Sequence, residues 1–158
     1  MDFRVVALPA ASFAPLFGLS NQELAARGAL RLVADRRPGF PCRVSLRDAD
    51  RGESLLLLNH EHLPVAGPYR SRHAIYVREG AAEYVPAVNE VPEVLGSRLL
   101  SVRAFDAVGM MVDADVTDGS GVAPLISRYL DDPRVDFLHL HNARPGCYAA
   151  RAVRAAVA

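Results

Sequence analysis

The chain has 158 residues, of which 51% are hydrophobic and 23% charged, as is usual for a globular protein with a sizeable core. It carries 18 basic and 18 acidic residues, so its formal net charge is +0. Proteins that hold nucleic acid through its phosphates usually have an excess of positive charge, so this balance disfavours nucleic acid as a partner. The length predicts a single globular domain that covers residues 1–158.

All of the basic residues are arginines, and lysine does not occur. Schiff-base lysine chemistry and a phosphate loop ending in Gly-Lys are therefore excluded. Anion recognition has to use the planar guanidinium group, which suits carboxylate and phosphate. Two cysteines do not make a disulfide framework, and no apolar run approaches the length of a membrane span. These features predict a cytoplasmic protein that does not interact with a membrane.

The first third of the chain predicts short strands and one well-marked helix. FRVVAL is typical of a strand that ends at Pro9. In LSNQELAARG, Ser20 and Glu23 form a capping box and Gly28 supplies a left-handed stop, so a short helix is expected there. LRLVAD alternates weakly, the arginine-bearing turn RRPGFP follows, and CRVSL predicts a second short strand.

The middle of the chain predicts two strands that carry histidines. LLLLNHEH predicts a largely buried strand, on which His60 and His62 share a face with the leucines before them. HAIYVRE predicts another strand, with His73 on the same face as Ile75 and Val77. The loop between them contains two prolines and a glycine and is not expected to be regular.

The last third predicts a short helix after Pro92 and then a hairpin made of RLLSVRAF and GMMVDADV. The second hairpin strand is expected to point Asp113 and Asp115 outward and its apolar residues inward, namely Met110, Val112, Ala114 and Val116. VAPLISRYL has the apolar stripe of a helix, DFLHLHNA predicts a strand, and CYAARAVRA fits either. Strands with only two or three short helices predict a single α+β domain with a mainly antiparallel sheet.

The imidazole and thiol side chains fall in two regions of the sequence. Cys42, His60, His62 and His73 lie in a central block, and His139, His141 and Cys147 lie near the end. Both NHEH and HLH place histidines two residues apart, which on a strand puts both rings on one face. A fold could therefore bring the two regions together into one site.

The paired histidines suggest a metal site. His139 and His141, completed by His60, His62 or Asp113, could hold zinc or non-haem iron, which take three or four ligands, commonly histidine nitrogens and a carboxylate. The simpler alternative is that strand histidines hydrogen-bond to their neighbours. HEH lacks the four-residue helical spacing of a zinc protease.

Arginines in loops beside glycine and proline suggest a pocket for a small polar or anionic ligand. The candidate ligand-binding residues are Arg43, Arg70, Arg72, Arg144, Cys147 and Asn142. The alternative is that these arginines are surface charges paired with nearby acidic residues. Cys147 would need a nearby base or positive charge to act as a nucleophile, and a buried, inert thiol is the simpler reading.

Five segments together resemble a family of small bacterial proteins, the domain of unknown function 1203. The segments are PGFPCRVSL, LLLLNHEH, PYRSRHAIYVRE, RAFDAVGMM and HNARPGCYAAR. The resemblance runs over nearly the whole chain and implies a bacterial origin. The family has no assigned activity, so the resemblance implies no catalytic residues.

These observations predict a protein that binds a small polar or anionic ligand in one cleft lined by His, Arg and Cys, with zinc or iron as a candidate cofactor. Whether it is an enzyme stays open. In an enzyme, His139 or His141 would be the general acid or base, and Arg43, Arg72 or Arg144 would clamp the anion. The alternative function is a non-catalytic homodimeric interaction domain, whose interface is the VAPLISRYL helix or an exposed strand edge.

Overall fold

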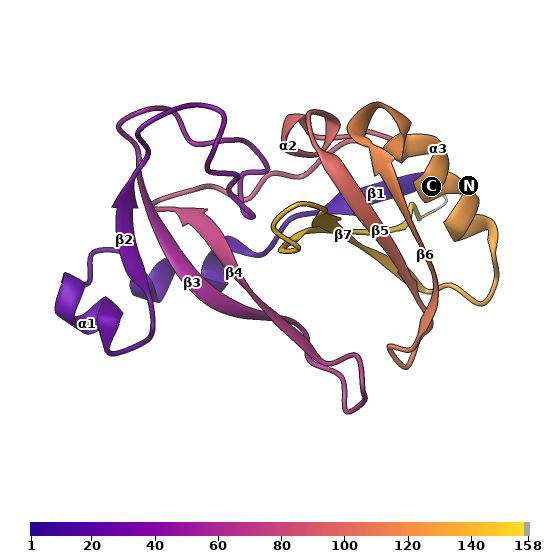
Figure 1. Ribbon diagram of the computed structural model, residues 1–158, viewed down its shortest axis with the longest axis horizontal. Coiled ribbons are helices and arrows are strands. Elements are labelled where there is room, and N and C mark those ends of the chain that lie inside the picture. The colour runs from indigo at the N-terminus through magenta and orange to yellow at the C-terminus, as the bar shows by residue number, and fades with distance from the viewer. Residues whose placement is uncertain (157–158) are drawn as a thin grey trace.

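Two antiparallel sheets form the framework of the computed structural model, which describes residues 1–156 (Figure 1). The strands are β1 (Phe3–Val6), β2 (Leu30–Val33), β3 (Ser54–Leu63), β4 (Ser71–Arg78), β5 (Leu99–Phe105), β6 (Met111–Asp118), β7 (Phe137–Asn142) and β8 (Tyr148–Arg154). The helices are α1 (Asn21–Ala25), α2 (Glu93–Gly96) and α3 (Val122–Asp131), with 3₁₀ turns η1 (Ala10–Ser12), η2 (Ala14–Leu16) and η3 (Gly119–Gly121). The predicted α+β class is confirmed. Within residues 1–156, no helix is long and apolar enough to cross a membrane.

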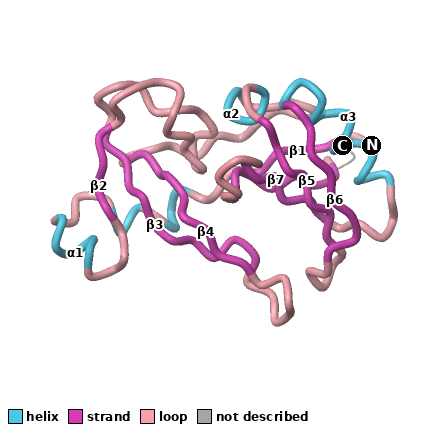
Figure 2. Tube along the Cα trace, viewed as in Figure 1, coloured by secondary structure: helices cyan, strands magenta, loops and turns pink. Residues whose placement is uncertain are grey.

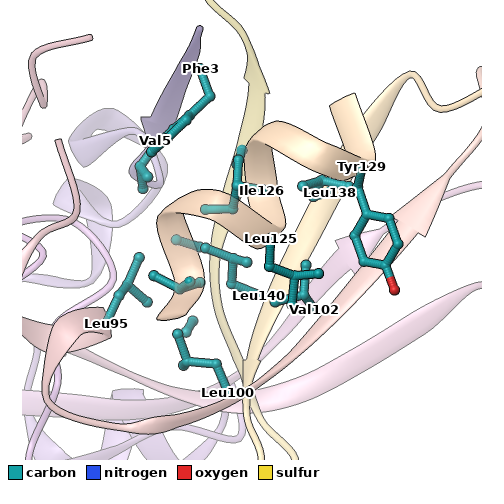
Figure 3. Packing of buried hydrophobic residues seen from close by; sticks show 14 of the residues in the cluster. Phe3, Val5, Leu95, Leu100, Val102, Leu125, Ile126, Tyr129, Leu138 and Leu140 are labelled. Carbon is teal, nitrogen blue, oxygen red and sulfur yellow. The ribbon is translucent and has the colours of Figure 1, made fainter. Parts of the chain in front are cut away.

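The five-stranded sheet, in the order β1-β8-β7-β5-β6, is covered on one face by α3. Leu125 and Ile126 of α3 are buried against Leu138 and Leu140 of β7 (Figure 3), and Leu130 belongs to the same buried cluster. The predicted apolar stripe of this helix is confirmed, and its burial holds the helix on the sheet. The stripe is therefore covered within the chain and is not free to form a dimer interface.

The three-stranded sheet, in the order β2-β3-β4, lies beside the larger one and has a core of its own. Figure 2 shows the two groups of strands joined by long loops. Leu56 of β3 and Ile75 and Val77 of β4 pack against Phe13 and Leu24 from the N-terminal segment. The faces predicted for β3 and β4 are thus the buried ones.

The predicted α1 cap is confirmed. The Ser20 side chain accepts from the backbone N–H of Glu23, and the Glu23 carboxylate accepts from the backbone N–H of Ser20. Gly28 follows with a φ of 68°, in the left-handed region that glycine tolerates. This element needs only local contacts, which is why its sequence pattern is enough to predict it.

CRVSL does not form the predicted strand. Within CRVSL only Cys42 makes an isolated bridge, with Tyr76, and its backbone N–H donates to the Arg47 carbonyl across a tight turn. Leu46 lies at a φ of 48°, which no strand residue adopts. The alternating pattern instead reflects burial of Cys42, Val44 and Leu46 in a loop. The undecided segment CYAARAVRA forms strand β8.

The face prediction for β6 is wrong for most of the strand. Asp113 and Asp115 lie opposite Ala104 and Val102, which belong to the core under α3, so the two carboxylates are on the α3 side. Asp115 pairs there with Arg128 of α3. Met110, Ala114 and Val116 are exposed, whereas Val112 packs against the core. Alternation defines two faces, but the placement of α3 decides which face is covered.

Gly119 is needed where η3 passes close to the end of α2. A Cβ atom there would lie 2.3 Å from the carbonyl oxygens of both Leu95 and Gly96, and these backbone atoms cannot rotate away. Gly119→Ala is therefore expected to lower the free energy of unfolding by about 2 kcal/mol or more, measured by urea denaturation. Gly67→Ala, with no atom within 4 Å, is the control and should change it by less than about 0.5 kcal/mol. Equal effects of the two substitutions would contradict this reading.

Candidate functional site

Four histidines from the two sheets meet where the sheets face each other. His139 and His141 point from one face of β7, the face opposite α3, because they are two residues apart on a strand. His62 of β3 reaches them, and its Nδ1 lies 3.3 Å from Nδ1 of His139. Its Nε2 lies 2.7 Å from Nδ1 of His73 on β4. The two histidine-bearing regions of the sequence are thus brought together.

A β-bulge contributes to this arrangement. Glu61 lies opposite Arg72 and Leu63 opposite Ser71, so His62 is an extra residue without a partner in the ladder. A bulge bends its strand and redirects a side chain. His60, two residues earlier in the regular part of the strand, contacts Phe13 instead and lies outside the cluster. Asp113, on the α3 side of the sheet, cannot reach it either.

Aromatic rings enclose the histidine cluster. The Tyr148 ring stacks on His62 with centroids 4.8 Å apart, and His73 also stacks on His62. Phe105 and Phe137 pack against His139. His139 and His141 are buried among these rings, whereas His62 and His73 are partly exposed.

Burial keeps these imidazoles neutral. It lowers the pKa of His139 to about 2, of His141 to about 3 and of His62 to about 4, and positive charge nearby adds to each shift. Arg103 on β5 lies opposite His139, is half-buried, and contributes to that charge. At neutral pH each ring therefore has one protonated nitrogen and one lone pair.

The orientation of His141 is set by the backbone. Its Nδ1–H donates to the Gly146 carbonyl oxygen at 2.9 Å, which leaves Nε2 as the nitrogen with the lone pair. Nε2 is fully buried and has no hydrogen-bond partner among residues 1–156. A buried nitrogen of this kind needs an explanation, since such groups are normally paired.

A cavity of about 950 Å³ lies on the other side of the β7–β8 hairpin. Asn142 and Cys147 line it, together with four arginines and one carboxylate, which are Arg36, Arg43, Arg98, Arg144 and Asp118. No histidine lines it. The single His/Arg/Cys cleft expected from the sequence is therefore two sites, because Asn142 points away from the face that carries His141.

The four arginines of the cavity differ in their burial and in the partners of their guanidinium groups. Arg43 is 2% exposed and donates to the backbone carbonyls of Tyr148 and Pro41 and to Sγ of Cys147. Arg98 pairs at 2.7 Å with the buried Asp48. Arg36 pairs with Asp35 at the surface. Arg144 is exposed at the cavity and makes no ion pair within residues 1–156.

The remaining predicted site residues lie elsewhere. Arg70 pairs with Glu61, and neither Arg70 nor Arg72 lines the cavity. Sγ of Cys147 accepts from Arg43 at 3.1 Å and from the Asn142 amide at 3.5 Å, while the His141 ring is bonded to Gly146. The described contacts therefore hold Cys147 in an arginine and amide environment without a cysteine–histidine pair.

Comparison with protein-family models matches residues 39–154 to the family described as "Protein of unknown function (DUF1203)". The chain belongs to the DUF1203 family. The match covers the histidines of β3, β4 and β7 and three of the four arginines of the cavity, because only Arg36 lies before its first residue. No curated protein and no solved structure matches the chain. Membership of DUF1203 assigns no activity, so a function has to be argued from the two sites.

The sequence analysis placed His73 in the central histidine-bearing block without a role, and it did not select Tyr148 or Arg103, which the structure also puts beside the histidines. Arg103 lies opposite His139 in the pairing of β5 with β7. The sequence could have indicated Arg103 only if this strand pairing had been known. Only the contact between the two sheets brings His73 and Tyr148 into the cluster.

Proposed function

We propose that this protein binds a small anionic ligand in the cavity beside the β7–β8 hairpin, with Arg144 as the exposed guanidinium that meets the anion. The cavity volume of about 950 Å³ is of the size that small-molecule ligands occupy. Arg36 and Arg98 are paired with carboxylates, but Arg43 and Arg144 make no ion pair within residues 1–156, so two guanidinium groups outnumber the one carboxylate of the lining, Asp118. A positive concave surface concentrates anions and orients them.

The observation that carries the proposal is the amide of Asn142. This residue is 6% exposed and lines the cavity, and its Oδ1 is buried without a hydrogen-bond partner in residues 1–156. Its Nδ2 is already directed at Cys147. A ligand hydroxyl or amine that donates to Oδ1 would satisfy this acceptor while its anionic group meets Arg144. The ligand class is therefore a small carboxylate or phosphate that also carries a donor group.

The proposal is for binding rather than catalysis. His139 and His141, the candidate acid and base, do not line the cavity, so no imidazole is available there to move a proton. We further propose a cytoplasmic setting, because the free thiols of Cys42 and Cys147 suit a reducing compartment, and a bacterial origin, because the family resemblance implies it.

The alternative of an interaction domain rests on β6, which is an edge strand with Val116 56% exposed. Asp113, Asp115 and Asp118 on this strand are also exposed. Charged residues on an edge strand are a common protection against pairing with another chain. These charges favour the ligand cavity over a dimer formed through this edge.

A thermal-shift screen with inorganic phosphate and with small hydroxy-carboxylates tests the proposal. We expect at least one of them to raise the melting temperature in a concentration-dependent way, and Arg144→Gln to weaken its binding about tenfold or more, since one charge-assisted hydrogen bond is lost. Arg51→Gln removes the same charge from an exposed turn outside the cavity and should bind like the wild type. A screen without any stabilising anion, or equal weakening by both substitutions, would reject the proposal.

A further inference from the structure

We propose that His62, His139 and His141 together bind one divalent transition-metal ion, of which zinc is the best fit. These three residues can each offer one ligand atom with all atoms within 4.8 Å of one another. The site is separate from the anion cavity, and the inference does not depend on the function proposed there.

The spacing of two nitrogens agrees with a shared metal. Two ligands at about 2.0–2.1 Å from a tetrahedral ion lie about 3.3–3.4 Å apart. Nδ1 of His62 and Nδ1 of His139 are 3.3 Å apart. Two neutral imidazoles at this distance can share at most one hydrogen bond, whereas a metal ion would use both lone pairs.

The contact between His62 and His73 has a different role. Nε2 of His62 and Nδ1 of His73 are only 2.7 Å apart, which is a hydrogen-bond distance and too short for two ligands of one tetrahedral ion. If His62 donates its Nε2–H to His73, its Nδ1 carries the lone pair and faces His139. His73 is then a positioning residue that fixes the tautomer of His62.

His141 is held in the same way by a second group. Its Nδ1–H donates to the Gly146 carbonyl, so Nε2 is the only nitrogen that can coordinate. That atom belongs to a residue that is 0% exposed, and it has no partner within residues 1–156. A metal-bound histidine usually donates its other N–H to a carbonyl or a similar acceptor, as His141 does. A network of histidines without metal leaves this nitrogen unpaired, and a metal ion satisfies it.

The donor set selects the metal. Three imidazole nitrogens and no carboxylate suit zinc and its neighbours in the first transition row and do not suit magnesium or calcium, which require oxygen ligands. Three neutral ligands leave the ion with its full charge and one open tetrahedral position. The nearby Arg103 favours an anion there, so hydroxide or another small anion is the expected fourth ligand.

The test uses untagged protein, because a histidine tag binds the same metals. After loading with zinc and dialysis, inductively coupled plasma mass spectrometry should find one zinc per chain in the wild type. His62→Gln and His141→Gln should each lose the bound zinc. His60→Gln is the matched control, because His60 lies on the same strand but contacts Phe13 and is outside the cluster. It should retain one zinc.

Cobalt provides a second measurement that does not rely on stoichiometry. Cobalt bound to the wild type and to His60→Gln should show the intense visible absorption of a tetrahedral site, and His62→Gln should not. If the ligand variants fail to fold, His73→Gln replaces them, and it should retain the metal with an affinity about 10–100-fold lower. Zinc that is lost from the wild type on dialysis, or that binds equally well to His62→Gln and the wild type, would overturn the proposal. Wild-type affinity in His73→Gln would overturn the assignment of the His62 tautomer.

Discussion

Arg43→Ala is expected to lower the free energy of unfolding by about 3–5 kcal/mol. Arg43 is buried between the two sheets, and its guanidinium donates to the carbonyls of Pro41 and Tyr148 and to Sγ of Cys147. Burial lowers the pKa of Arg43, so the charge is tolerated only because these acceptors surround it. Alanine would leave the acceptors without donors and open a cavity.

Urea denaturation at neutral pH measures this loss, with two comparisons. Arg144→Ala removes an exposed arginine of the same cavity and should change the free energy by less than about 0.5 kcal/mol. Arg43→Lys keeps the charge but presents its donors from one nitrogen, which cannot reach three acceptors in different directions. Its free energy of unfolding should therefore lie between those of Arg43→Ala and the wild type. If Arg43→Ala were as stable as Arg144→Ala, the contacts of Arg43 would not hold the two sheets together.

Acid is expected to unfold the metal-free protein at a pH where most globular proteins are still stable. The pKa values of His62, His139 and His141 lie at about 4, 2 and 3 in the folded state, against 6.5 for a free histidine. Between these values and 6.5 the unfolded chain binds more protons than the folded chain, so protonation favours unfolding. The stabilisation is therefore complete above pH 6.5 and is lost as the pH falls below it.

The size of this effect follows from the number of histidines. Each can contribute a slope of up to about 1.4 kcal/mol per pH unit below its unfolded value, so three can contribute up to about 4 kcal/mol per unit. Urea denaturation between pH 7.5 and pH 5, with a chelator present, measures the slope. His139→Gln should reduce the slope by the contribution of one histidine, which is up to about 1.4 kcal/mol per pH unit. A slope near zero would show that the three imidazoles titrate alike in the folded and unfolded chains.

Local patterns in the sequence were sufficient for most elements. The capping box at Ser20 and Glu23 and the apolar stripe of α3 predict their helices, because a helix depends on contacts between residues close in the chain. Alternation identified the buried faces of β3 and β4. The same alternation of apolar and polar residues gave a wrong prediction for CRVSL, where burial in a loop produces the pattern of a strand. It also gave the wrong buried face for β6, because alternation defines two faces and only the packing of α3 decides which of them is covered.

The sequence indicated most of the candidate residues and the meeting of the two histidine-bearing regions, but it did not indicate that the cavity arginines would lie apart from the histidines. The HLH spacing places His139 and His141 on one face of any strand, because side chains alternate along a β-strand. The same alternation sends Asn142 to the opposite side, and this separates the arginine-lined cavity from the histidines. His62 joins the cluster, whereas His60 does not. This difference coincides with a bulge whose position depends on pairing with β4, and long-range pairing of that kind leaves no mark in a single strand.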